Sequence, residues 1–252
     1  MNKISNSNIT LIEETHKYIL ASNPDMQFTS ATTFIKYFFE PFDSIGIANS
    51  LTRSHIKYIN MTPQELVKVW DKKAAEGTIV HSEIEQFIKE KATPTRAKSK
   101  LAIEWMEQNI SDRYDVLSEV IVYSEELEIA GTIDILLHDK EQDTYQILDW
   151  KTSERINTSS FKSKKGTHHT TSKLMDCNFI HYSLQLSLYQ YILEKYYNLK
   201  VTGREIIHIA DAEVIIHKSK YLKNEIENMF TANRAKLKKK AESSLTKEFR
   251  TN

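Results

Sequence analysis

Apolar and polar residues alternate near the start of the chain and then take up a helical spacing. Residues 8–20 alternate over two short stretches, which predicts a pair of strands with a turn near residues 14–15. A helix follows, capped by Thr29 or Ser30 and running through Phe38, and its aromatic residues are expected to pack on the main body. The chain is therefore expected to begin with a small β-hairpin and a short helix.

Two longer helices are predicted in the next part of the chain. The segment EPFD (40–43) ends the first helix, because the residue before a proline disfavours helical backbone angles. The segment TPQE (62–65) has a threonine cap, a proline at the first helical position and a glutamate three residues after the cap. The helical pattern continues to about Lys91, with a possible break at Gly77, and another helix spans residues 95–109.

The second half of the chain is richer in strands. Apolar runs joined by short polar links predict three strands, at Val116–Ser124, Ile129–His138 and Tyr145–Thr152. Beyond them the pattern predicts a polar loop, an amphipathic helix, one or two strands and a C-terminal helix, at residues 153–172, 180–197, 204–217 and 220–245. This order predicts an α/β fold whose mixed, largely antiparallel sheet carries helices on its faces.

Composition narrows the class of protein. A length of 252 residues and a hydrophobic content of 40% suit a globular chain with one large domain or two small ones. Lysine plus arginine and aspartate plus glutamate both number 34, which argues against a general basic coat. A local basic groove beside an acidic site remains compatible with nucleic-acid binding.

Several other classes are disfavoured. The single cysteine, Cys177, excludes an internal disulfide, a four-cysteine zinc site and a four-cysteine iron–sulfur cluster, and it is expected to be a small semi-buried residue. No apolar run is long enough to predict a transmembrane helix, and the first residues do not resemble a secretory or organellar leader. A cytoplasmic location without membrane contact is the expectation.

Two acidic residues are predicted to face each other on neighbouring strands. Asp149 and Lys151 project to the same face, because side chains alternate along a strand. If the turn between the second and third strands is centred between residues 141 and 142, Asp134 lies directly opposite Asp149. Opposed like charges repel. A divalent cation such as Mg²⁺ or Mn²⁺, which prefers oxygen ligands, would relieve that repulsion.

The preceding hairpin adds a third acidic residue under a similar assumption. With its turn centred on residues 125–126, Glu119 falls opposite Thr132, which shares a face with Asp134. Lys151 beside a metal could then orient or help deprotonate water and stabilise charge on a phosphate. A surface ion pair among exposed charges is the alternative, because the D-x-K pattern alone is common.

Two predicted helices also place polar residues at helical spacing. Gly77, His81 and Glu85 lie four apart and share a helix face, where glycine permits close approach of another backbone and His81 could reach a metal. A hydrogen-bonded structural histidine is the alternative for His81. Gln185 and Tyr189 are also four apart, and alone they are compatible with ordinary boundary positions.

Taken in order, four stretches resemble the PD-(D/E)XK nuclease superfamily in its RecB-like branch, namely GTIVHSEIEQF (77–87), GTIDILL (131–137), ILDWKTS (147–153) and YSLQLSLYQYIL (182–193). The segment FTSATTFIKYFFEPFD (28–43) is similar to the region before the histidine helix in viral and phage members and in the mitochondrial genome maintenance exonuclease group. The resemblance covers about residues 10–215. It implies a restriction-endonuclease-like core with a mixed, largely antiparallel central sheet flanked by helices.

The resemblance further implies one nuclease domain over residues 1–252. Its parts would be an N-terminal hairpin and helical region, a catalytic core and a C-terminal helix, at about residues 1–110, 111–217 and 220–245. Because of the viral likeness, a phage or a large DNA virus is the suggested source, with the host cytoplasm as the location.

The resemblance assigns a metal centre. Asp134 and Asp149 would bind one or two Mg²⁺ or Mn²⁺ ions, and the backbone carbonyl of Trp150 would be a further ligand. His81 would complete the shell, and Lys151 would be the catalytic lysine. Some relatives carry a cysteine-bound iron–sulfur cluster, for which this chain has no cysteines.

Supporting roles are assigned in the same way. Glu85 and Glu119 would act through water or by orienting Lys151. Gln185 and Tyr189 would hold the active-site loop or contact the DNA backbone.

DNA contacts are also suggested by basic segments. In KSKKGTHH (162–169), Lys162, Lys164 and Lys165 could grip phosphates near the scissile bond, with a solvated loop as the alternative. The segment RAKLKKK (234–240) could add nonspecific contacts, although a charged outer helix face explains it as well. Neither a helix-turn-helix nor a zinc finger is recognisable, so sequence-specific base reading is not expected.

Three functions follow from these observations. The leading hypothesis is an exonuclease that acts on DNA ends or single strands during replication, recombination or repair, with replication or recombination proteins as possible partners. A structure-selective endonuclease for flaps or branches is the second. A DNA-binding or assembly module with a decayed site is the third, and the intact aspartates and D-x-K triplet argue against it.

Overall fold

A mixed six-stranded sheet forms the centre of the computed structural model, which describes residue 4 and residues 8–233. The strands are β3 (Thr29–Ser30), β4 (Tyr114–Ser124), β5 (Ile129–Asp139), β6 (Thr144–Lys151), β7 (Val201–Ile209) and β8 (Val214–Lys218). They are ordered β3-β5-β6-β7-β8, with β4 also paired to β5. The pairs β4–β5, β5–β6 and β7–β8 are antiparallel, whereas β3–β5 and β6–β7 are parallel. The predicted mixed, largely antiparallel sheet is confirmed.

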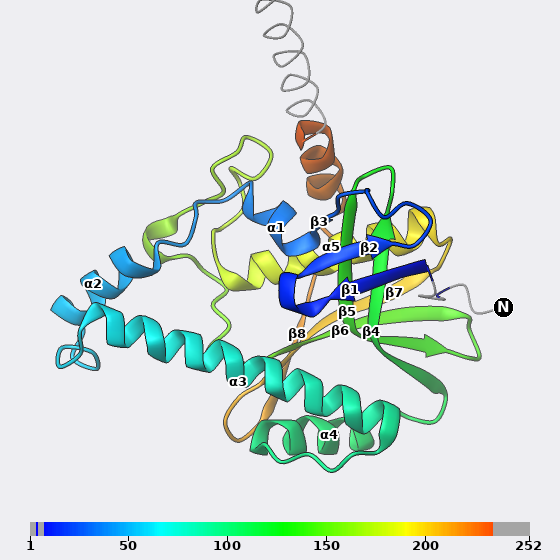
Figure 1. Ribbon diagram of the computed structural model, residues 1–252, viewed down its shortest axis with the longest axis horizontal. Coiled ribbons are helices and arrows are strands. Elements are labelled where there is room, and N and C mark those ends of the chain that lie inside the picture. Colours follow the sequence, from blue (N-terminus) through cyan, green and yellow to red (C-terminus); the bar gives the residue numbers. More distant parts are fainter. Residues whose placement is uncertain (1–3, 5–7, 234–252) are drawn as a thin grey trace, which may run out of the picture.

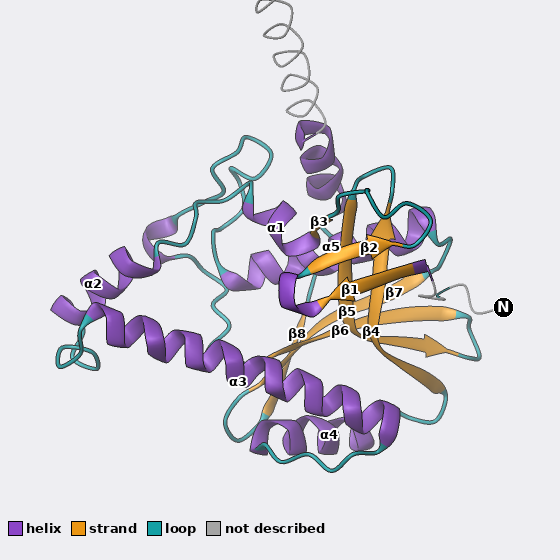
Figure 2. Ribbon diagram, viewed as in Figure 1, coloured by secondary structure: helices purple, strands orange, loops and turns teal. Residues whose placement is uncertain are grey.

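Helices cover both faces of this sheet (Figures 1 and 2). They are α1 (Ala31–Lys36), α2 (Ser44–Ser54), α3 (Pro63–Glu90), α4 (Ala97–Asn109) and α5 (Asn178–Tyr196), with short 3-10 turns at Glu13–Thr15 and Phe161–Ser163. Residues 223–233 are also helical. None of the helices in the described part of the chain combines the length and apolar character that crossing a bilayer requires.

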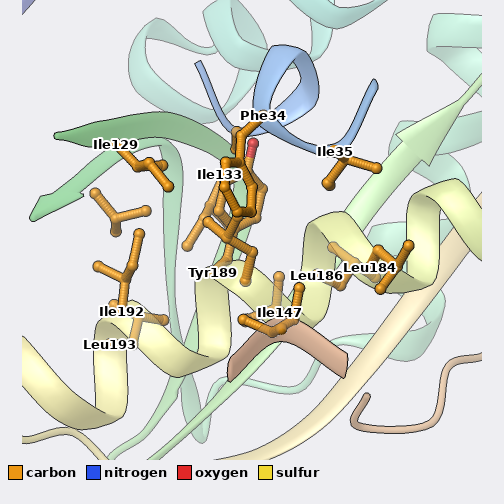
Figure 3. Close-up of a cluster of buried hydrophobic side chains, with 14 of the residues drawn as sticks. Phe34, Ile35, Ile129, Ile133, Ile147, Leu184, Leu186, Tyr189, Ile192 and Leu193 are labelled. Carbon is orange, nitrogen blue, oxygen red and sulfur yellow. The ribbon is translucent and has the colours of Figure 1, made fainter. Parts of the chain in front are cut away.

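Two apolar clusters hold the layers together. One joins α1, α5 and residues 223–233 to the sheet, and it includes Phe34, Ile133, Ile147 and Tyr189, which are labelled in Figure 3. The other joins α3 and α4 to the opposite face and includes Trp150. Helix α5 carries buried residues on all sides, as expected for a helix enclosed between other elements. Cys177 is buried and free at the start of this helix.

A separate hairpin covers part of the β4–β5 surface. Its strands are β1 (Ile9–Ile12) and β2 (Lys17–Leu20), joined by the turn that the sequence predicted. Ile9, Tyr18 and Leu20 pack against Ala130 of β5 and so fix the hairpin on the sheet.

Three differences from the sequence prediction concern helices. Helix α3 begins with the predicted capping box at Thr62 but runs without a break through Gly77. Helix α2 was not predicted, and it begins where Asp43 accepts a hydrogen bond from the Gly46 N–H. The predicted C-terminal helix is observed over residues 223–233, and the rest of it, with the basic segment 234–240, lies outside the described residues.

Candidate metal centre

The β5–β6 hairpin has the predicted register. Ile135 pairs with Leu148, and the pairing continues regularly to Asp139 and Thr144. Extended by one residue, this register sets Asp134 opposite Asp149. The turn is stabilised by Asp139, whose carboxylate accepts hydrogen bonds from two backbone N–H groups of the loop.

The predicted register of the β4–β5 hairpin is wrong by two residues. Ile121, not Glu119, pairs with Thr132. The turn lies later than predicted because Leu127 is buried and its N–H is bound by the Ser124 hydroxyl. A shift of two keeps the alternation of a strand. The register therefore sets Glu119 opposite Asp134.

At Glu119 and Asp134, the side chains of both strands of this hairpin switch from one face of the sheet to the other. Glu119 has a left-handed backbone with φ of 50°, which is uncommon for a residue other than glycine and clusters at functional sites. In β4, Val116 packs with the α3–α4 cluster, whereas Val120 packs with the α5 cluster. In β5, Ile133 and Ile135 differ in the same way. Simple alternation along one strand therefore does not predict which way these acids point.

Pairing of β5 also changes at this point. Strand β4 occupies one edge, while the other edge pairs with β3 at Ile129 and Ala130 and with β6 from Ile135 onward. Between these two partners, within the described residues, the backbone N–H of Trp150 reaches across and donates to Asp134 Oδ2 at 2.7 Å. Asp134 thus lies at this gap in the strand pairing, where the backbone of β6 orients it.

Three side chains from different elements converge beside this opening. Donor atoms of His81 on α3, Glu119 on β4 and Asp134 on β5 all lie within 4.8 Å of one another. His81 Nδ1 is 3.5 Å from Asp134 Oδ2. One imidazole nitrogen and two carboxylates at this spacing form a donor set that suits a single divalent cation.

Asp149 lies against the lysine instead of within this triplet. Its Oδ2 is 2.5 Å from Lys151 Nζ, and both side chains are largely buried. The ring of Tyr182 on α5 lies 4.7 Å from the same ammonium, as in a cation–π contact. Lys151 is therefore held between an acid from its own strand and an aromatic ring from α5.

The ionisation of these groups reflects crowding of negative charge. Burial and, to a lesser extent, the nearby Asp134 raise the pKa of Glu119 to about 8. Burial also raises the pKa of Asp149 to about 6, although Lys151 opposes this. Burial disfavours ionised Asp134 as well, but His81 and Lys151 outweigh it and lower the pKa of that carboxyl. The site holds more acidic groups than its own cations neutralise.

A cavity of about 470 Å³ opens onto the triplet. Its wall includes residues of the β1–β2 hairpin, the start of α1, one face of α3 and the α5 residues Gln185 and Tyr189. Gln185 donates a hydrogen bond to the Tyr189 hydroxyl at 3.1 Å. Gly131 is required here, because a side chain at this position would meet the Tyr189 ring at 2.5 Å.

Other predicted site residues lie at the edge of this arrangement or away from it. Glu85 is paired with Lys89 on the surface of α3. Lys164 is paired with Glu40 at 2.6 Å, and Lys162 lies over the exposed ring of Phe161. Neither these lysines nor Lys165 is among the residues that line the cavity.

Sequence reasoning missed some residues of the site. Tyr18 of β2 lines the cavity and is hydrogen-bonded through its hydroxyl to Thr132 at 3.1 Å. His16 also lines it, in a left-handed turn. Tyr182 could have been found from its position one helical turn before Gln185, whereas nothing local connects the hairpin residues with β5.

Comparisons with known proteins identify a family for most of the chain. Residues 55–252 match the family model described as the PD-(D/E)XK nuclease superfamily. No functionally curated protein matches the chain significantly. Among the solved structures that match is the one described as the crystal structure of SSO0001, at 12% sequence identity and a TM-score of 0.37, with 81% of this chain and 75% of the other covered.

Proposed function

Because the chain belongs to the PD-(D/E)XK nuclease superfamily, we propose that it is a divalent-metal-dependent exonuclease of the RecB-like kind, acting on DNA in replication, recombination or repair. The observation that carries the proposal is the convergence of His81, Glu119 and Asp134 beside a buried Asp149–Lys151 pair. Three ligands that line the cavity and a buried ammonium close to them are the parts that hydrolysis of a phosphodiester requires.

In this proposal, the side chains divide the work. His81, Glu119 and Asp134 hold Mg²⁺ or Mn²⁺, and we retain Asp149 and the Trp150 carbonyl as further ligands. Such an ion would supply a Lewis acid that polarises the scissile phosphate and would lower the pKa of bound water. Glu85 is left with a supporting role, because its ion pair with Lys89 places it outside the triplet.

Lys151 acts as a fixed positive charge. Burial alone would lower its pKa, but Asp149 and Asp134 outweigh burial and raise it, so the amine keeps its proton. A protonated amine cannot abstract a proton. Its contribution is therefore to stabilise negative charge that develops on the phosphate, with Asp149 and Tyr182 holding it in place.

DNA would enter along the cavity and the loop after β6. Gln185 and Tyr189 form the α5 wall and would hold the backbone near the metal. Residues 155–173 contain five lysines and arginines and no acidic residue, which gives this loop a local positive charge in a chain of zero net charge. Phe161 is 77% exposed beside Lys162 and offers a surface on which a base can stack.

Removing the loop charges should weaken DNA binding without affecting the chemistry. The double variant Lys162→Ala with Lys165→Ala is expected to reduce the slope of log affinity against log salt by about 1–2 units, because each lost phosphate contact removes close to one unit. Fluorescence anisotropy with labelled single-stranded DNA measures it. Lys218→Ala with Lys223→Ala is the control, since these lysines are exposed and do not belong to the loop. An unchanged slope would show that the loop is merely solvated.

A digest tests the proposed function as a whole. Purified protein with Mn²⁺ or Mg²⁺ should degrade end-labelled linear DNA, leave covalently closed circles intact and stop when EDTA is added. Equal cutting of closed circles would contradict exonuclease action. Cutting of a branched substrate at its junction, with its ends left untouched, would instead identify a structure-selective endonuclease.

A further inference from the structure

The chain is held firmly just after Lys151, where β6 ends. The ladder between β6 and β7 reaches the pair Lys151 and His208. Beyond this pair, the next hydrogen bond to the chain after Lys151 comes from a side chain instead of the backbone. His208 Nε2 lies 2.7 Å from the carbonyl oxygen of Ser153. A carbonyl only accepts, so Nε2 carries the proton and donates. His208 is 4% exposed and therefore well shielded from competing water.

Two further contacts hold the same segment from the other face. Lys98 of α4 donates through Nζ to the Thr152 carbonyl at 3.0 Å. Helix α3 approaches so closely at Gly77 that a side chain there would lie 2.8 Å from Thr152 Oγ1. Three elements that are distant in sequence therefore fix the two residues that follow the lysine.

We propose that His208 is a positioning residue for Lys151: by holding the Ser153 carbonyl it fixes the end of β6 and keeps the ammonium against Asp149. This inference rests on the proposed function of the site. In parallel pairs, registered residues project to the same face, so His208 stands beside Lys151 in the layer between the sheet and α5. Small displacements of a catalytic group have large effects on rate, which gives this hydrogen bond a kinetic consequence.

A pair of amide variants tests whether the Nε2 donor matters. A glutamine amide nitrogen is as many bonds from Cβ as His Nε2, whereas an asparagine amide nitrogen corresponds to Nδ1. His208→Asn is expected to lower kcat by about tenfold or more with unchanged DNA affinity, and His208→Gln should restore most of the rate. His217→Asn is the matched control, since that histidine on β8 lies 6.0 Å away and has no bond to Ser153.

A second measurement works without catalysis. In nitrogen-15 NMR of the lysine side chains, the Lys151 ammonium should give a protected signal in the wild type and in His208→Gln, and lose it in His208→Asn. If His208→Asn does not fold, Lys98→Met is used in its place. This variant removes the hydrogen bond to the Thr152 carbonyl at a side chain that is 24% exposed, and it should reduce kcat in the same way.

The outcomes separate the two proposals. A wild-type protein that degrades no DNA refutes the nuclease assignment, whatever the NMR signal shows. An active wild type whose His208→Asn variant keeps kcat and the protected signal refutes the positioning role. Equal loss of kcat in the asparagine and glutamine variants also refutes it, because the hydrogen bond would then not be the cause.

Discussion

Replacing Asp134 by asparagine is expected to abolish both divalent-ion binding and DNA cleavage. Asp134 contacts His81 and accepts a hydrogen bond from the Trp150 N–H. Its carboxylate also lies within 4.8 Å of Glu119, so it is close to both of the other proposed ligands. Asparagine keeps the size and the hydrogen bond but removes the charge that an ion needs. We expect ion affinity to fall by about 100-fold or more and kcat by about 1000-fold. Calorimetry with Mn²⁺ and a timed digest measure these effects.

The same substitution at Asp143 controls for loss of an acid from the same hairpin. Asp143 lies in the β5–β6 turn with 78% of its side chain exposed, and Asp143→Asn should bind Mn²⁺ and cut DNA as the wild type does. Because bound ions stabilise the folded state, Mn²⁺ should raise the melting temperature of the wild type and of Asp143→Asn but not of Asp134→Asn. Wild-type Mn²⁺ affinity in Asp134→Asn would remove this residue from the centre.

Local signals in the sequence were enough to predict most of the elements. Helix α3 was found from its capping box, in which Thr62 and Glu65 bind each other's backbone N–H groups. Helix α2 was missed although Asp43 caps it, because that residue belongs to the segment that ends the preceding helix. The amphipathic pattern of this helix, whose buried residues are Ala48 and Thr52, was overlooked as well.

The acidic cluster was harder to predict because it depends on registers. The β5–β6 register rested on the assumption that the turn is centred between residues 141 and 142, which is confirmed, and Asp139 stabilises this turn by accepting hydrogen bonds from the N–H groups of both residues. The β4–β5 turn could be centred on acidic residues or one position later, and burial of Leu127 decides for the second. Such burial depends on the assembled core, and it is not visible in the hairpin sequence itself.

Contacts between distant segments were beyond sequence reasoning. Tyr18 meets Thr132 across 114 positions, and His208 meets Ser153 across 55. Neither pair has a local pattern, because the fold brings the segments together through packing of other residues. The positive φ of Glu119 could not be predicted for the same reason. The direction of its side chain is set by the change of pairing along β5, which involves β3, β4 and β6 at once.

Lys151→Met is the second change with a large expected effect. Methionine keeps a long unbranched apolar side chain but removes the ammonium and its cation–π contact with the Tyr182 ring. We expect kcat to fall by about 100- to 1000-fold, as when a preorganised donor at a charged transition state is lost, with DNA affinity nearly unchanged. Lys151 also holds down the pKa of Asp149, which burial has raised to about 6, so the variant should raise the pKa of this carboxyl further.

Two companion variants separate charge from stability. Lys72→Met makes the same change at an exposed lysine of α3 and should be neutral. Lys151→Arg retains a positive charge and should keep part of the activity. Removing one partner of a buried ion pair destabilises the fold, so rates are compared at temperatures where thermal melting shows each variant folded. A folded Lys151→Met enzyme with the wild-type rate would exclude this lysine from the reaction, because no other cation of the described residues lies within 4 Å of Asp149.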